Sequence, residues 1–206
     1  MNSMPLSLAE RFEIAWTSIG GTNSKRIFNL VKANYDQGRY YHNWQHITNF
    51  FDYKEAFIPH IESSAEFDLA IFFHDVVYVP GAEDNEMKSI DFFVDCCQNV
   101  NTQSIERVKQ FIVATITHTS DDQEIQYMVD MDLAGLAADV PIFDQTVRDL
   151  HKEFSMYAWD EFVQGQYQYL LRFVERESIY FTDEFRNALE DKALKNIERL
   201  GRGDVE

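Results

Sequence analysis

Positive charge is scarce in this 206-residue sequence, which has 18 lysine and arginine residues against 35 aspartate and glutamate residues. The formal net charge at pH 7 is -17. Because no basic surface dominates, we expect neither nucleic acid nor an anionic membrane as a main partner. A small anionic substrate stays compatible with this charge, since a bound metal cation reverses the local field.

Cysteines and long apolar runs are scarce too. The two cysteines, Cys96 and Cys97, are neighbours, and neighbours rarely bridge each other, so we expect free thiols packed on a helix in a reducing cytoplasm. No window reaches the length of a membrane span. The first residues, "MNSMPLSLAERF", have neither the basic start nor the apolar stretch of a signal peptide. These features predict a cytoplasmic protein.

Strand patterns are nearly missing, and helical spacing dominates. Only "DVVYVP" is β-prone, and it is too short to support a sheet. A capping box, Ser7 to Glu10, predicts a first helix that ends at Gly20-Gly21. Further helices are expected in "SKRIFNLVKANYDQG", "NWQHITNFFDYKEAF", "SAEFDLAIFFHDVVY" up to Pro80-Gly81, "NEMKSIDFFVDCCQNV" and "TQSIERVKQFIVATITHT", followed by a short segment with Asp130 and Asp132 and three longer helices over about 141–200. With 45% hydrophobic residues and no repeat or linker, the sequence predicts an all-α fold in one domain over 1–206.

The apolar run "FDLAIFFHDVVYVP" carries two strong metal ligands, His74 and Asp75. Aspartate is almost never fully buried unless it is paired or bound to a cation. Upstream, His42 and His46 are four residues apart and share one face if helical, and downstream Asp132 lies among apolar neighbours in "MDLAGL". Other interpretations are a polar helix start for the two histidines and a helix N-cap for Asp132. Together these residues supply enough imidazole and carboxylate for one divalent metal site, or two.

Five sequence blocks occur in an order typical of a known family: "RYYHNWQHI", "FFHDVVY", "DNEMKS", "TITH" and "MDLAGL". They resemble the small predicted phosphohydrolases of the HD superfamily of metal-dependent phosphohydrolases. The later "RFVERESIYFT" and "EDKALKNIERL" look like the closing helices of that subfamily. The resemblance covers about 30–200, with core motifs over about 30–136 and closing helices over about 140–200. It implies a helical bundle of the HD-domain type around a metal site.

The resemblance implies that His46, His74, Asp75 and Asp132 bind the metal. Two imidazoles and two carboxylates suit Mn, Fe, Co, Ni or Zn, and Mg if water completes the shell. The sequence does not choose among them, nor between one and two ions per chain. "YHNWQHI" also resembles a segment of the cyclic-nucleotide phosphodiesterases, distant HD relatives. That resemblance implies that His42 is a general acid, which suits an imidazole near neutral pH.

Two more residues have a structural and a functional interpretation each. His118 ends another apolar helix. It is interpreted either as a core or capping histidine, or as a ligand of a second metal or a contact to phosphate. Glu86 belongs to an acidic helix start or to a loop over the site, where it binds a water of the metal. His151 and Gln166 stand where the subfamily tends to carry arginine, which weakens the case for an identical phosphate pocket. Nearby cations that could compensate are Arg148, Lys152 and Arg172. His60 belongs to no motif, and we expect it at the surface.

These features predict a metal-dependent phosphohydrolase that acts on a nucleotide or another small phosphorylated metabolite through a metal-activated water, with His42 and Asp75 as catalytic residues. Asp75 would bridge to a second metal where one is present. One alternative is a di-iron HD oxygenase, since the same ligands with His118 can hold two irons. The other is a non-catalytic sensor that binds a nucleotide or a metal, with which the departures at His151 and Gln166 are compatible. The sequence predicts no oligomeric state.

Overall fold

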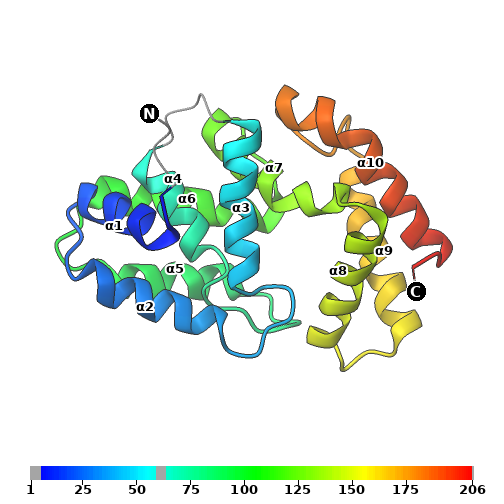
Figure 1. The fold of residues 1–206 in the computed structure, drawn as a ribbon, viewed down its shortest axis with the longest axis horizontal. Helices are drawn as coiled ribbons and strands as arrows, with labels where there is room; N and C mark the ends of the chain where they lie inside the picture. Colours follow the sequence, from blue (N-terminus) through cyan, green and yellow to red (C-terminus); the bar gives the residue numbers. More distant parts are fainter. Residues whose placement is uncertain (1–5, 59–63, 206) are drawn as a thin grey trace.

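The computed structural model describes residues 6–58 and 64–205, and all regular secondary structure in these ranges is helical (Figure 1). The predicted all-α fold is confirmed. His60 lies outside the described residues. None of the helices in the described part of the chain combines the length and the apolar character that a membrane span requires.

The chain forms ten α-helices and one 3₁₀-helix within the described ranges. The first group is α1 (Leu8–Ser18), α2 (Ser24–Tyr35), α3 (Trp44–Phe57), α4 (Ala65–Phe73), α5 (Asn85–Cys96), α6 (Thr102–Thr117) and α7 (Gln123–Leu133). The 3₁₀-helix η1 (Ala134–Ala137) connects it to α8 (Val140–Glu153), α9 (Trp159–Val174) and α10 (Asp183–Arg202). Figure 1 shows α8, α9 and α10 side by side at one end of the molecule, so η1 joins two groups of helices.

Helix α4 lies at the centre of the first group and packs against α1 and α6. Its second half, Leu69–Phe73, is apolar on all sides and buried, as expected for a helix at the centre of a core, while Glu66 and Asp68 near its start are half-buried. The ring of Phe72 meets that of Phe12 edge-on, with ring centroids 5.2 Å apart, and Phe73 lies beside the same ring at 6.1 Å. The capping box predicted for α1 is confirmed, since Ser7 and Glu10 hydrogen-bond each other reciprocally. The two cysteines are free thiols, as expected.

The prediction that α4 continues to Pro80-Gly81 is wrong, because the helix ends at Phe73. Side chains from other segments bind the backbone that follows. Arg39 donates to the carbonyl oxygens of Asp75 and Val76, at 2.6 and 3.0 Å. Since these carbonyls are taken by a side chain, the backbone leaves the helical path directly after His74. The chain then turns at Gly81, which has a φ of 80° that glycine adopts without strain.

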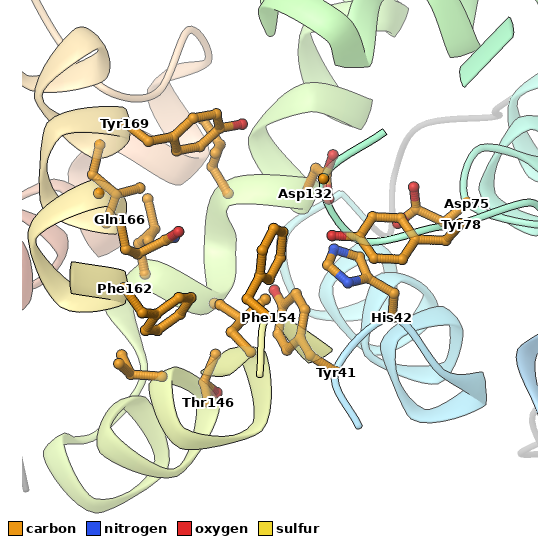
Figure 2. A pocket seen from close by; sticks show the side chains of 18 of the residues that line it. Tyr41, His42, Asp75, Tyr78, Asp132, Thr146, Phe154, Phe162, Gln166 and Tyr169 are labelled. Carbon is orange, nitrogen blue, oxygen red and sulfur yellow. The ribbon is translucent and has the colours of Figure 1, made fainter. Parts of the chain in front are cut away.

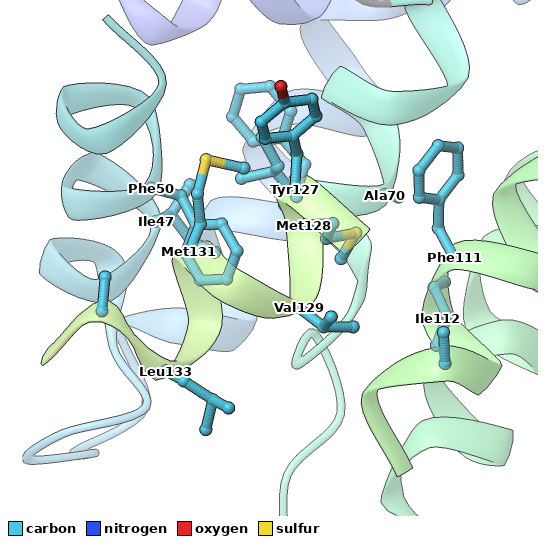
Figure 3. Close-up of a cluster of buried hydrophobic side chains, with 14 of the residues drawn as sticks. Ile47, Phe50, Ala70, Phe111, Ile112, Tyr127, Met128, Val129, Met131 and Leu133 are labelled. Atoms are coloured by element: carbon cyan, nitrogen blue, oxygen red, sulfur yellow. The ribbon is translucent and has the colours of Figure 1, made fainter. Parts of the chain in front are cut away.

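Helix α7 also differs from the prediction, which gave Asp130 and Asp132 only a short segment. Both lie in an 11-residue helix, and Asp132 is in its last turn rather than at the N-cap of the next helix. Figure 3 shows α7 between α3 and α6, with Met131 beside Phe50 and with Val129 facing the opposite way. Apolar packing on both sides therefore fixes the helix that carries Asp132.

Asp130 has a structural role. Its fully buried carboxylate accepts hydrogen bonds from the backbone N–H groups of Phe181 and Thr182 and from the Thr182 hydroxyl, at 2.7 to 2.8 Å. Burial raises the pKa of Asp130 to about 6, although these hydrogen bonds lower it. Thr182 is the N-cap of α10, so the carboxylate ties α7 to the start of the last helix.

We expect Asp130→Ala to lower the free energy of unfolding by about 2–4 kcal/mol. Three hydrogen-bond donors lose their acceptor, and the two that belong to Thr182 are buried. Urea denaturation followed by circular dichroism measures this loss. Asp130→Asn, which keeps one acceptor oxygen, should lose less. A loss below about 0.5 kcal/mol for the alanine variant would show that water replaces the carboxylate at little cost.

Candidate metal centre and adjoining cavity

Four helix ends meet at one place in the molecule. His46 lies in the first turn of α3, His74 directly follows α4, and Asp132 lies in the last turn of α7. His118 directly follows α6 in the left-handed conformation, with a φ of 50°. Three of these ends are C-terminal, where the helix dipole carries partial negative charge and favours a cation.

The metal-ligating atoms of His46, His74 and Asp75 all lie within 4.8 Å of one another. Nε2 of His74 is 3.3 Å from Nε2 of His46 and 3.2 Å from Oδ2 of Asp75. Asp132 joins the group through His46, whose Nε2 lies 3.4 Å from Oδ1 of Asp132. The structure therefore brings together the four residues that the sequence singled out as ligands.

Hydrogen bonding prepares His74 as a ligand. Its Nδ1 lies 2.9 Å from the carbonyl oxygen of Ile71, which can only accept, so Nδ1 carries the hydrogen. The lone pair of the neutral ring is then on Nε2, which faces Asp75 and His46. A backbone partner of this kind orients metal-binding histidines in general.

The electrostatics of the cluster also favour a cation. Burial alone would lower the pKa of His74, but the carboxylates of Asp75 and Asp132 outweigh it and raise that pKa to about 9. Burial would raise the pKa of Asp75, yet the neighbouring histidines hold it below its usual range. The same holds for Asp132, where hydrogen bonds from His118 and His46 lower the pKa well below the ordinary value. Two ionised, half-buried carboxylates thus face one point.

The donor set fits a divalent ion. Ligand atoms about 2.0–2.2 Å from a common ion lie about 3.0–3.6 Å from one another. The separations between His74 and its two partners, and between His46 and Asp132, fall in that range. His46 and Asp75, at 3.7 Å, need only a small approach. Imidazole nitrogens with carboxylate oxygens are the donors that Mn, Fe, Co, Ni and Zn accept.

The backbone after Asp75 is held from two sides. Besides the bonds from Arg39, the Ser89 hydroxyl lies 3.1 and 3.2 Å from the backbone nitrogen and oxygen of Val77. The Asn85 side chain likewise binds both backbone groups of Val79, at 2.9 and 3.0 Å. Arg39, Asn85 and Ser89 belong to the sequence blocks that resemble the HD family, and here they fix the segment that presents Asp75 and Tyr78.

His42 lies beside the metal cluster but is bound elsewhere. Its Nδ1 is 2.6 Å from Oε2 of Glu153, and its ring stacks on Tyr78 with centroids 3.7 Å apart. Oε1 of Glu153 accepts three backbone N–H groups, those of 40, 41 and 42, at 2.7 to 3.0 Å. Burial would raise the pKa of Glu153, but the bonds from His42 and from the backbone lower it. An ionised Glu153 therefore fixes Nδ1 of His42 as a donor and leaves Nε2 for another partner.

His118 contacts Asp132 and not the other cluster residues. Its Nε2 lies 3.0 Å from Oδ2 of Asp132, on the side opposite to the oxygen that meets His46. Its Nδ1 is buried and has no hydrogen-bond partner among the described residues. His118 thus orients the Asp132 carboxylate, as an outer partner of a ligand does. Its predicted roles as a second-metal ligand or phosphate contact stay predictions.

A cavity of about 720 Å³ opens from the cluster toward α8 and α9 (Figure 2). Its walls include His42, Tyr78, Asp75, Asp132 and His118 on the side of the cluster. The opposite walls come from η1, α8, α9 and the turn between the last two helices. Figure 2 shows Asp132, Asp75 and His42 on one side of this space and Phe154, Phe162 and Tyr169 across it. The volume suits a small organic molecule.

The remaining predicted residues divide between this cavity and its surroundings. Glu86, Gln166 and Arg172 line the cavity, so a contact of Glu86 with a metal water stays a prediction. His151 lies behind the wall, where its Nε2 meets the carbonyl oxygen of Tyr157 at 3.0 Å and its ring packs on Phe162. Of the three cations named as compensating, only Arg172 lines the cavity.

Glu153, Tyr78 and the aromatic walls of α8 and α9 were missed from the sequence. Glu153 is 111 residues from His42 and lies in an ordinary polar stretch, "LHKEF". Tyr78 lies three residues after Asp75, but its stacking depends on a turn where a helix was expected. The one available signal was the helical spacing of aromatic residues in α8 and α9, which equally fits a core.

Compared with models of protein families, with curated proteins and with solved structures, the chain gives no match. The fold and the site together define an all-α protein in which two buried histidines and two half-buried aspartates form a cluster beside a cavity.

Proposed function

We propose that this protein is a metal-dependent phosphohydrolase that acts on a small phosphorylated metabolite. One observation carries the proposal: His46, His74, Asp75 and Asp132 converge beside an organic-sized cavity that Asp75 and Asp132 line. The resemblance of the sequence blocks to the HD superfamily supports the same reaction class. A buried carboxylate–imidazole cluster without a cavity would serve structure alone, and this one has a cavity.

The chain's own residues have distinct parts in such a reaction. His46, His74, Asp75 and Asp132 would hold a divalent ion, which supplies acidification of water and polarisation of the phosphoryl group. Arg39, Asn85 and Ser89 keep the segment after Asp75 rigid, so that the ligand does not move. His118 keeps Asp132 oriented. Placement of this kind limits reorganisation during the reaction.

His42 is suited to protonate the leaving oxygen. It lines the cavity beside Asp75, yet its Nδ1 is engaged by Glu153 rather than by the cluster. Nε2 is therefore the nitrogen available to a substrate. A general acid needs a fixed ring and a free proton-carrying atom within reach of the leaving group. Stacking on Tyr78 supplies the first requirement, and the cavity supplies the second.

Elemental analysis of the purified chain, followed by a phosphatase panel with the metal it contains, tests this function. We expect one to two divalent transition ions per chain and release of phosphate that a chelator abolishes and added metal restores. Inactivity toward aryl phosphates and nucleotides with manganese, iron and nickel would contradict the proposal. Oxygen consumption by an iron-loaded sample would then favour the di-iron oxygenase.

Glu153→Gln tests the orientation of His42. The amide nitrogen of glutamine would meet Nδ1 of His42 as a second donor, so the ring must change tautomer or rotate. We expect kcat on an alkyl phosphate to fall about tenfold to hundredfold, with metal content unchanged, as for partners that orient an active group. Stopped assays of phosphate release measure kcat. Glu161→Gln, which alters an exposed carboxylate of the cavity wall, is the matched comparison. Equal losses in both variants would contradict a role specific to Glu153.

A further inference from the structure

We propose that the substrate is a monoester of phosphate with a large, mainly apolar and preferably aromatic alcohol, and that chains of two or three phosphates are excluded. This inference rests on the proposed function and concerns the cavity walls outside the metal cluster. The reaction would join a water oxygen to phosphorus and break the bond between phosphorus and the ester oxygen. The ester oxygen keeps the electron pair and takes a proton, giving the free alcohol and inorganic phosphate.

The charges around the cavity limit the substrate to one phosphate group. Four carboxylates line it: Asp75, Glu86, Asp132 and Glu161. Arg172 is the single lysine or arginine among the lining residues that the structure describes. Asp75 and Asp132 would largely neutralise a divalent ion. Arg172 supplies one positive charge, so a chain of two or three phosphates would bring more negative charge next to Glu86 and Glu161 than this single cation can pair.

The walls opposite the cluster favour an apolar body. Five aromatic rings from α8, α9 and their connecting turn face the cavity: Phe143, Phe154, Tyr157, Phe162 and Tyr169. Leu150 and Leu170 continue this surface. A flat ring can stack on such side chains, and its burial adds affinity in proportion to its apolar area. A small polar alcohol would leave most of this surface uncovered.

Apart from Glu161 and Arg172, the polar groups in the wall formed by α8 and α9 are few and uncharged. Thr146 and Gln166 line the cavity, and neither side chain has a hydrogen bond within the described part of the chain. They can therefore bind one polar edge of the alcohol. The Tyr169 hydroxyl points toward Asp132 across the space in Figure 2, which places it toward the phosphate rather than the body.

Gly165 offers a direct test of this assignment. It lines the cavity in the middle of α9, and a Cβ added there meets no atom within 4 Å. Its backbone is helical, so Gly165→Leu should fold at least as well as the parent chain, because leucine favours helices over glycine. The leucine side chain would occupy the space assigned to the alcohol. Gln168→Leu, an exposed position of α9 that does not line the cavity, is the matched control.

The experiment uses the full chain loaded with the metal found by elemental analysis. Phenyl and naphthyl phosphate have leaving groups of similar acidity and differ in apolar area, and benzyl and glycerol phosphate are both esters of primary alcohols. We expect kcat/KM to favour naphthyl over phenyl, and benzyl over glycerol, by about tenfold or more. The kcat/KM for adenosine monophosphate should exceed that for adenosine triphosphate by a similar factor. Gly165→Leu should abolish the naphthyl preference, and Gln168→Leu should keep it.

Binding separates this proposal from the proposed function. Naphthylmethyl phosphonate, which cannot be hydrolysed, should bind at least tenfold more tightly than methyl phosphonate by calorimetry, and Gly165→Leu should remove that difference. Binding in this order without turnover of any ester would contradict the phosphohydrolase and support the ligand class. Turnover with a preference for glycerol phosphate or the triphosphate, unaffected by Gly165→Leu, would overturn the ligand class alone. The absence of both binding and turnover would overturn the proposed function and the ligand class together.

Discussion

Asp75→Ala is expected to remove the bound divalent ion and to lower phosphate release by about 10³-fold or more, since loss of a mere outer partner of a metal already costs 10–100-fold. Asp75 meets both histidines of the cluster, at 3.2 Å from His74 and 3.7 Å from His46. Without its charge, two imidazoles and Asp132 remain, and Asp132 approaches only His46 among them. Elemental analysis after gel filtration and an assay of phosphate release measure the two effects.

Two comparisons make this result specific. Asp91→Ala removes an exposed carboxylate of α5 and should leave metal content and turnover unchanged. His118→Ala removes only a partner of Asp132, so it should weaken metal binding by about 10–100-fold without abolishing it. Full metal occupancy in Asp75→Ala would show that the ligand assignment is wrong. Metal loss in Asp91→Ala would show that the ions bind the acidic surface instead.

Much of the fold could be predicted because its signals are local. The capping box of α1, the apolar spacing of the helices and the glycines near their ends all lie within one turn of the residues they affect. The end of α4 could not be predicted, since it depends on Arg39 and Ser89, which bind the backbone after His74 from distant segments. Helical propensity alone lets the apolar run continue.

The candidate ligands could be named from the sequence, because an aspartate beside a histidine within an apolar run needs a partner or a cation. Their neighbours could not. Glu153 reaches His42 only because α8 packs beside the start of α3, and the cavity exists only because α8 and α9 stand opposite the cluster. A resemblance in short blocks carries no information about such packing, and these later helices form the walls that we propose for the body of the substrate.

His42→Ala should keep metal near the level of the parent chain yet lower kcat by about 10²–10⁴-fold on an alkyl phosphate, the usual contribution of a general acid. Nδ1 of His42 belongs to Glu153, so loss of the ring removes no ligand atom from the cluster. His46→Ala, four residues further along, should lose metal and turnover together. Elemental analysis and kcat for both variants separate the two roles.

The leaving group supplies the stricter test of His42. Nitrophenolate departs without a proton, so the loss in His42→Ala should shrink to about tenfold or less on nitrophenyl phosphate, whereas benzyl phosphate should show the full loss. A loss of equal size on both esters would mean that His42 acts on binding or on the cluster and not on the leaving oxygen. Metal loss equal to that of His46→Ala would make it a ligand. Unchanged turnover on benzyl phosphate would reduce it to a polar residue before α3 whose ring packs on Tyr78 and holds Glu153.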